Sequence, residues 1–175
     1  MKKRFLVITA MLFICSIFIW NVPAQAKTKN FLMDKSKVYT ISYYHYEGKK
    51  KKTEKSVFHY KKQYKSWIAT TGGELWEEQN KTYYSWGGGY GGKDEIKRNA
   101  KVGDKVYGYG SASKSYLGKV TSIKATVKTK AGTFKNCTVV QNKKLKQYYA
   151  PNNGLVLSID SKGKIEREVT KISKK

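Results

Sequence analysis

The sequence predicts a mainly β protein, with a single antiparallel sheet domain curled as a barrel, half-barrel or sandwich. Segments rich in β-branched and aromatic residues follow one another at short intervals, and no long stretch between them has the 3.6-residue period of an amphipathic helix. Strands that succeed one another this closely pair as antiparallel hairpins. A sheet of such hairpins must close or fold over to bury its apolar face.

The N-terminus has the three parts of a secretory signal peptide. Basic residues at 2–4 precede an apolar run over 5–20, and Ala24-Gln25-Ala26 provides a small-x-small cleavage site. The run is shorter than the roughly 20 residues that cross a bilayer as a helix, so cleavage is favoured over a retained anchor. We therefore expect a signal peptide over 1–26, a short basic tail over 27–36 and a single β-rich domain over 37–175.

The first half of the domain is expected to contain two hairpins. The first joins strands over 38–46 and 57–68 through a long basic loop, and the second joins strands over 75–79 and 82–86 across Asn80-Lys81. Gly72-Gly73 marks the entry to the second hairpin, because glycine adopts positive φ at little cost. The glycine-rich segment 87–92 predicts a loop, and the segment 94–100 predicts a single helical turn.

The second half reads as further strands. Extended segments are predicted over 105–110 and 116–128, and in the latter Ile123, Ala125 and Val127 alternate with polar residues, as in a strand with one buried face. The remaining predicted strands are 133–141, 144–150, 155–160 and 164–172. The last segment also fits a helical spacing, but the hairpin-like turn Ser161-Lys162-Gly163 before it favours a strand.

Short motifs near the C-terminus carry a resemblance. Ala131-Gly132-Thr133-Phe134, then Tyr148-Tyr149-Ala150-Pro151 and Gly154-Leu155-Val156, resemble a C-terminal module of uncharacterised secreted bacterial β-rich proteins. The resemblance covers about the last third of the mature chain, and Asn152-Asn153 stands where Gly-Val is more usual. It implies a sheet-forming fold, similar to periplasmic half-barrels that hold lipids or lipoproteins, and it implies no catalytic residue.

Cysteine and histidine residues predict neither a catalytic nor a metal site. Cys137 is the only cysteine after residue 26, so it has no disulfide partner within the mature chain and is expected to be a small buried residue. His45 and His59 would face each other if the first hairpin turned about residue 52. Zinc needs a further protein ligand, and the neighbouring aromatic residues explain both histidines as ordinary sheet residues.

The acidic residues leave one enzymatic hypothesis open, a glycosidase. Glu74, Glu77 and Glu78 lie close in sequence, and Asp94-Glu95 follows the glycine-rich segment, so a carboxylate pair for sugar hydrolysis is conceivable. In a chain this basic, however, lysines are the expected partners of these acids. The sequence identifies no catalytic residue, no metal ligand and no cofactor motif.

Charge is the strongest functional signal. After residue 26 the chain has 33 lysine and arginine residues against 12 acids, a formal charge of +21, which favours anionic partners. Lysines alternate with aromatic residues, so Tyr60, Lys62 and Tyr64 are expected to share one strand face. Lysine attracts phosphate and carboxylate groups, and aromatic rings stack on sugars or bases. The expected polyanion-binding residues are Lys49, Lys50, Lys51, Lys52, Lys55, Lys61, Lys62 and Lys65, with an aromatic face of Tyr44, Tyr60, Tyr64 and Trp67.

Together these features predict a secreted, non-enzymatic protein, extracellular or associated with the cell wall. Its expected partners are anionic polymers of the envelope of a bacterium with a single membrane, and no transmembrane span is expected after cleavage. Two alternatives stay open: a secreted enzyme that acts on wall material or polysaccharide, and a small β-barrel that binds an apolar ligand or a protein partner. The oligomeric state is not predicted.

Overall fold

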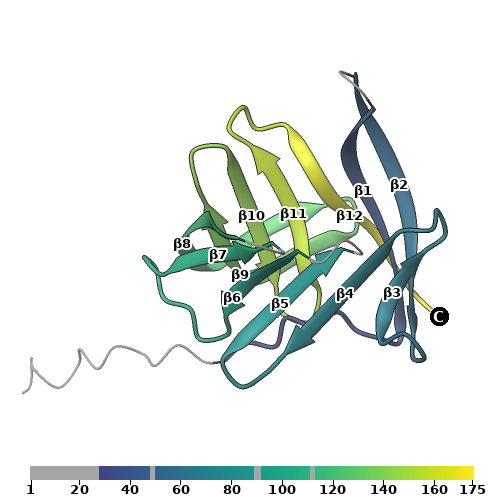
Figure 1. The fold of residues 1–175 in the computed structure, drawn as a ribbon, viewed down its shortest axis with the longest axis horizontal. Coiled ribbons are helices and arrows are strands. Elements are labelled where there is room, and N and C mark those ends of the chain that lie inside the picture. Colours follow the sequence, from purple (N-terminus) through teal and green to yellow (C-terminus); the bar gives the residue numbers. More distant parts are fainter. Residues whose placement is uncertain (1–27, 48–49, 89–91, 111–112) are drawn as a thin grey trace, which may run out of the picture.

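A computed structural model describes residues 28–47, 50–88, 92–110 and 113–175, which form a closed antiparallel barrel (Figure 1). The strands of this part of the chain are β1 (Lys37–Glu47), β2 (Lys50–Lys61), β3 (Ser66–Ala69), β4 (Glu74–Gln79), β5 (Tyr83–Gly88), β6 (Lys93–Lys97), β7 (Lys105–Tyr109), β8 (Lys114–Thr129), β9 (Gly132–Gln141), β10 (Leu145–Ala150), β11 (Gly154–Asp160) and β12 (Ile165–Lys174). Each strand pairs with the next, and β1 pairs with β12 to close the sheet. The predicted fold class is thus confirmed, with the barrel as its form.

The described residues contain no helix that could cross a membrane. The predicted signal peptide, residues 1–26, lies outside the described residues. So do Lys49 and the centre of the glycine-rich segment, 89–91.

Alternation of side chains along the strands separates an inner from an outer face. In β7, Val106 and Gly108 are buried while Lys105 is exposed. In β8, the predicted alternation is confirmed, because Ile123, Ala125 and Val127 are half-buried, whereas the polar residues that follow each of them are exposed. This period of two is the property of a strand with one face toward a core.

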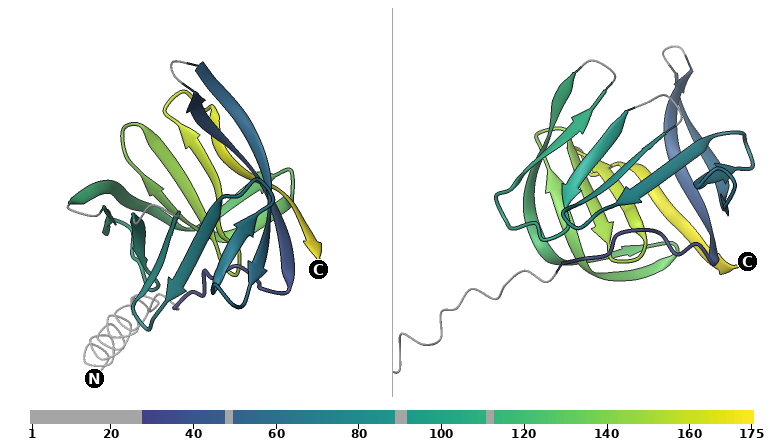
Figure 2. Two further views of the ribbon diagram at one scale, coloured as in Figure 1. Left: turned by 45° about the vertical axis from the view of Figure 1, so that its right-hand side comes forward. Right: turned by 60° about the horizontal axis from the view of Figure 1, so that its bottom comes forward.

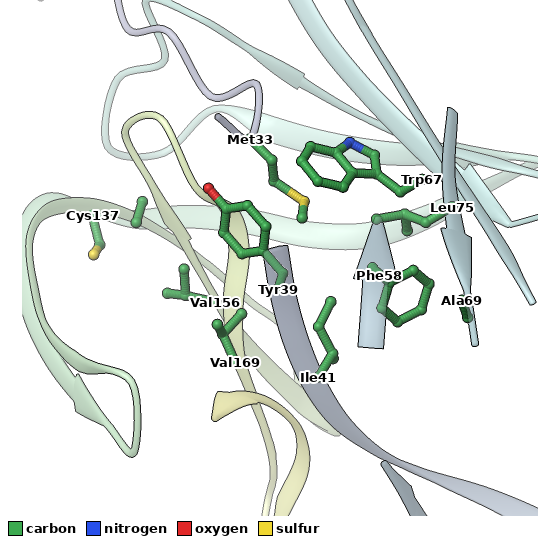
Figure 3. Packing of buried hydrophobic residues seen from close by; sticks show 11 residues of the cluster. Met33, Tyr39, Ile41, Phe58, Trp67, Ala69, Leu75, Cys137, Val156 and Val169 are labelled. Carbon is green, nitrogen blue, oxygen red and sulfur yellow. The ribbon is translucent and has the colours of Figure 1, made fainter. Parts of the chain in front are cut away.

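Two contacting groups of buried side chains fill the barrel. One gathers Tyr39 and Ile41 of β1 with Trp67 of β3, and the rings of Tyr39 and Trp67 meet edge to face at 5.2 Å between centroids (Figure 3). The other surrounds Tyr84 of β5 and Tyr149 of β10. Edge-to-face packing of this kind is favourable beyond the area it buries.

The segment 28–36, here called the floor segment, closes one end of the barrel (Figure 2). Its Phe31 is 0% exposed and its Met33 is 4% exposed. The backbone amide of Phe31 donates to Gln79 Oε1 at 2.9 Å, and that of Met33 donates to Glu77 Oε2 at 3.1 Å. The expected short basic tail is therefore packed into the fold. Its three consecutive apolar residues, Phe31, Leu32 and Met33, are too few to show a period in the sequence.

The first hairpin differs from the prediction in its register. Its strands are joined by only two residues, since Glu47 pairs with Lys50, and the backbone of His45 pairs with Lys52 while His59 pairs with Val38. The predicted facing histidines and the predicted long basic loop are therefore wrong. Tyr39 pairs with Phe58 on the inner face, and burial of such apolar pairs sets the register of a strand.

Three further predicted elements are also corrected. The predicted strand 57–68 is interrupted by a turn at 62–65, where Lys65 has a φ of 52°, and β3 begins after it. The predicted helical turn at 94–100 is largely strand β6, and Gly87 and Gly88 belong to β5. Asp94 and Ile96 both face inward. An alternation of only two inward residues is too short a pattern to predict a strand. The predicted last strand, 164–172, is confirmed as β12.

Candidate functional site

The predicted polyanion-binding lysines do not form one patch. Lys50 and Lys52 are exposed near one end of β2 and Lys55 near its middle, whereas Lys61, Lys62 and Lys65 are exposed at or just beyond its other end. Lys50 and Lys61 are eleven steps apart, or about 37 Å along the strand. Lys51 is half-buried, pairs with Glu166, and lies 4.3 Å from the ring centre of Tyr44.

The predicted aromatic face is not present as a surface. Trp67 is only 1% exposed and belongs to the core, and Tyr60 packs against it at 5.5 Å between ring centroids. Tyr64 is 62% exposed, but it lies in the turn after β2. Tyr44 lies near the far end of β1, beside Lys51 and Lys164. The expectation fails because the chain turns at 62–65, so residues 60 and 64 do not share a strand face.

A depression of about 400 Å³ on the outer face of β5–β8 was not predicted. Its lining includes Tyr83, Glu95, Lys97, Gly103, Asp104, Lys105, Tyr107, Tyr109 and Lys114. Lys114 lies 4.0 Å from the ring centre of Tyr107, a cation–π contact. The two acids have lysine partners, because Glu95 pairs with Lys93 at 3.2 Å and Asp104 with Lys97 at 3.8 Å. We call this surface the outer groove. The alternation of lysine and tyrosine over 105–116 is the sequence pattern from which the outer groove could have been predicted.

Inside the barrel, a level of polar side chains lies above the packed core. Glu77 of β4, Trp86 of β5 and Asp94 of β6 are in register with one another on the inner face. From β12, the guanidinium of Arg167 lies 5.1 Å from the ring of Trp86, and Tyr43 of β1 pairs with Arg167. We call these five residues the inner ring.

Glu77 is the most fully bonded member of the inner ring. Its carboxylate accepts from the Tyr84 hydroxyl at 2.6 Å, from Trp67 Nε1 at 3.1 Å and from the Met33 amide at 3.1 Å. Burial raises the pKa of Glu77, and these three donors oppose that shift. Burial also raises the pKa of Tyr84, so its hydroxyl stays protonated and donates. Glu77 thus ties β3, β5 and the floor segment to β4.

Gly154 of β11 makes room for this network. Its φ is 64°, and a Cβ atom there would lie 2.8 Å from the Tyr84 hydroxyl and 2.9 Å from Glu77 Oε1. Glycine is therefore required for two reasons, its backbone conformation and the close approach of two polar side chains. The adjoining turn holds Asn152 with a φ of 59°, a conformation that asparagine tolerates better than most residues.

Arg167 and Asp94 contrast with Glu77, because the side chain of neither forms a hydrogen bond or ion pair with another described residue. The Nε atom of Arg167 is completely buried without a partner. Burial raises the pKa of Asp94 to about 6, and the positive charge of Arg167 opposes this shift. Burial likewise lowers the pKa of Arg167 from its very high usual value. Sequence reasoning missed Arg167, although it is one of only two arginines after residue 26.

The predicted acidic cluster is not assembled into a catalytic pair. Glu74 and Glu78 are exposed, whereas Glu77 and Asp94 face inward on strands two positions apart, about 10 Å between their backbones. Cys137 is buried as predicted, and burial raises the pKa of its thiol to about 11, so it is not a thiolate at neutral pH. Within the described ranges, no group of three histidine, cysteine or acidic residues is arranged to hold a metal ion.

Comparison of the chain with protein-family models finds no match. Comparisons with curated proteins and with solved structures find no significant match either. The outer groove and the inner ring are therefore the two features from which a function can be argued.

Proposed function

We propose that the mature chain is a secreted, non-enzymatic protein that associates with anionic polymers of the cell envelope through its lysine-rich outer surface. The observation that supports this most is the disposition of charge. Asp34, Glu95, Asp104 and Glu166 each have a lysine partner. Many other lysines are exposed on the outer face and at the turns, so the charge of +21 is available to a polyanion.

The outer groove is the part of this surface with the best shape for a polymer chain. Lys105 is exposed beside Tyr107 and Tyr109, and Lys114 lies against the same two rings. The ammonium groups attract phosphate or carboxylate, and the rings provide flat surfaces for sugar units. The enzyme alternative has weaker support, because both oxygens of Glu77 are engaged by structural donors.

The experiment is sedimentation of the mature protein, residues 27–175, with purified envelopes over a salt series. We expect binding at low salt that falls steeply as salt screens the exposed charges. The paired variant Lys105→Glu/Lys114→Glu is compared with Lys61→Glu/Lys62→Glu, which makes the same change of charge in the turn after β2. A larger loss in the first variant would support the outer groove. No binding of the wild-type protein at low salt would refute the proposal.

A further inference from the structure

Two opposite charges inside the barrel have no side-chain partner among the described residues. The inner ring places Arg167 and Asp94 close enough for the charge of Arg167 to act on Asp94, yet neither side chain makes a hydrogen bond or an ion pair in this part of the chain. Buried polar groups in native proteins are almost always paired, and an unpaired one calls for a specific explanation. Within the same ring, Glu77 accepts three hydrogen bonds.

The stacking of Arg167 leaves the edge that carries its two Nη atoms without a partner among the described residues. Its guanidinium lies over the ring of Trp86 at 5.1 Å, so one flat face is covered. The N–H donors point outward in the guanidinium plane. Nε is buried, and the edge formed by the two Nη atoms matches two oxygens of a carboxylate or phosphate. Asp94 is the direct ladder partner of Trp86, at a Cα distance of about 5 Å, and it therefore lies beside the stacked guanidinium.

Solvent reaches the inner face at this level and not below it. Tyr43, Trp86, Asp94 and Arg167 are partly exposed, whereas the inner residues one step nearer the floor segment are buried: Ile41, Tyr84, Ile96 and Val169. The hairpin turns at this end carry exposed lysines, and because consecutive strands alternate in direction they all lie at the same end of the barrel: Lys50, Lys114, Lys144 and Lys162. The inner ring is thus reached from the end opposite the floor segment.

We propose that the inner ring binds a small zwitterion, whose carboxylate or phosphate group pairs with Arg167 and whose ammonium group pairs with Asp94. An anion alone would leave Asp94 unpaired and would bring negative charge toward two carboxylates. A cation alone would leave Arg167 unpaired. A zwitterion satisfies both groups without changing the net charge of the interior, which is the least costly way to fill such a site. The simplest ligand of this class is a free amino acid, with its side chain against Tyr43 and Trp86.

This proposal does not depend on polymer binding by the outer surface. It is tested by an NMR signal of the Arg167 side chain. The mature chain has two arginines, so a ¹⁵N NMR spectrum of arginine Nε–H groups contains two signals to assign. Arg98 is the internal reference, because its Nε donates to the backbone oxygen of Lys29 at 2.8 Å. The probes are two matched series: alanine, propionate and ethylammonium, and phenylalanine, 3-phenylpropionate and 2-phenylethylammonium.

We expect alanine or phenylalanine to shift the Arg167 signal saturably, at least tenfold more tightly than its deaminated or decarboxylated analogue, while the Arg98 signal stays in place. Asp94→Asn should abolish this preference, so that the amino acid and its deaminated analogue bind alike. Glu95→Gln, one residue along on the outer face, should retain it. The Asn variant is expected to fold, because the side chain of Asp94 makes no hydrogen bond with another described residue.

The proposal is overturned if no probe moves the Arg167 signal at about 50 mM, a concentration that fills a site of millimolar Kd. It is equally overturned if propionate or 3-phenylpropionate binds wild-type protein as tightly as the matching amino acid. In that case Asp94 would take no part in recognition. Envelope binding is measured separately, so failure of either proposal leaves the other intact.

Discussion

Replacing Glu77 by leucine would remove the acceptor that joins three separate parts of the barrel. The change leaves three donors facing an apolar side chain, namely the Tyr84 hydroxyl, Trp67 Nε1–H and the Met33 amide. Trp67 and Tyr84 are each 1% exposed, so water does not readily replace the lost acceptor. Each buried donor left unpaired costs about 1–3 kcal/mol.

The three donors together give a cost of about 3–9 kcal/mol. Burying the leucine side chain returns about 1.5–3 kcal/mol. The expected loss in the free energy of unfolding is therefore about 2–6 kcal/mol, a large part of the 5–15 kcal/mol that holds a typical domain folded. Glu77→Gln should lose much less, because the amide oxygen accepts two of the bonds and the Tyr84 hydroxyl can accept from the amide nitrogen.

Urea unfolding followed by tryptophan fluorescence measures this loss, and the buried Trp67 beside Glu77 reports on the region directly. Glu78→Leu is the matched control, since it makes the same chemical change one residue away on an exposed side chain. The expected effect of the control is within about 0.5 kcal/mol. If Glu77→Leu unfolds within about 1 kcal/mol of wild type, Glu77 is not the structural tie that its hydrogen bonds indicate.

Three further predictions concern stability. Asp94 has a pKa of about 6 when folded against 3.8 for the ordinary carboxyl, so it holds its proton more tightly in the folded state and its ionisation lowers stability as pH rises from about 4 to 6. Asp94→Asn should remove this loss, making the variant more stable than wild type at pH 7 by up to about 3 kcal/mol and equal to it near pH 4, as measured by urea midpoints against pH. Gly154→Ala should lower the free energy of unfolding by more than Gly163→Ala does, because both glycines have positive φ but only the first has atoms close to the added Cβ, and equal losses would contradict this account. Phe31→Ala should lower it by about 3–5 kcal/mol, and thermal unfolding of this variant at the wild-type temperature would show that the floor segment is a dispensable tail.

Local residue patterns were sufficient to predict most strands. β1 and β8 follow from β-branched and aromatic runs, with alternating burial in Ile123, Ala125 and Val127, whereas β12 was predicted from the turn that precedes it. The register of the first hairpin was missed because a run of lysines resembles a loop as much as a strand at the end of a barrel. Only the inward packing of Tyr39 against Phe58 distinguishes the two, and sequence alone does not show which pairs face inward.

The inner ring could not be predicted from the sequence, for a different reason. Its members come from β1, β4, β5, β6 and β12, and they meet only because the sheet closes on itself. Glu77 was noticed among three neighbouring acids, but the pattern did not reveal that it alone of the three faces inward. Trp67 was assigned to a surface because lysines flank it in sequence, and its burial depends on the turn at 62–65.

The pairing of β1 with β12 joins the beginning of the folded chain to its end. Position 37 meets position 174, and the amide of Asn152 donates to the backbone oxygen of Asn30 at 2.8 Å. Hairpins can form one after another along the chain, but the ring of strands cannot be completed until β12 is available to pair with β1. Contacts so distant in sequence carry the largest loop-closure entropy and slow the final step. The sheet therefore remains open, with two unpaired edges, until β12 is available, and β12 is the strand whose arrival completes the barrel.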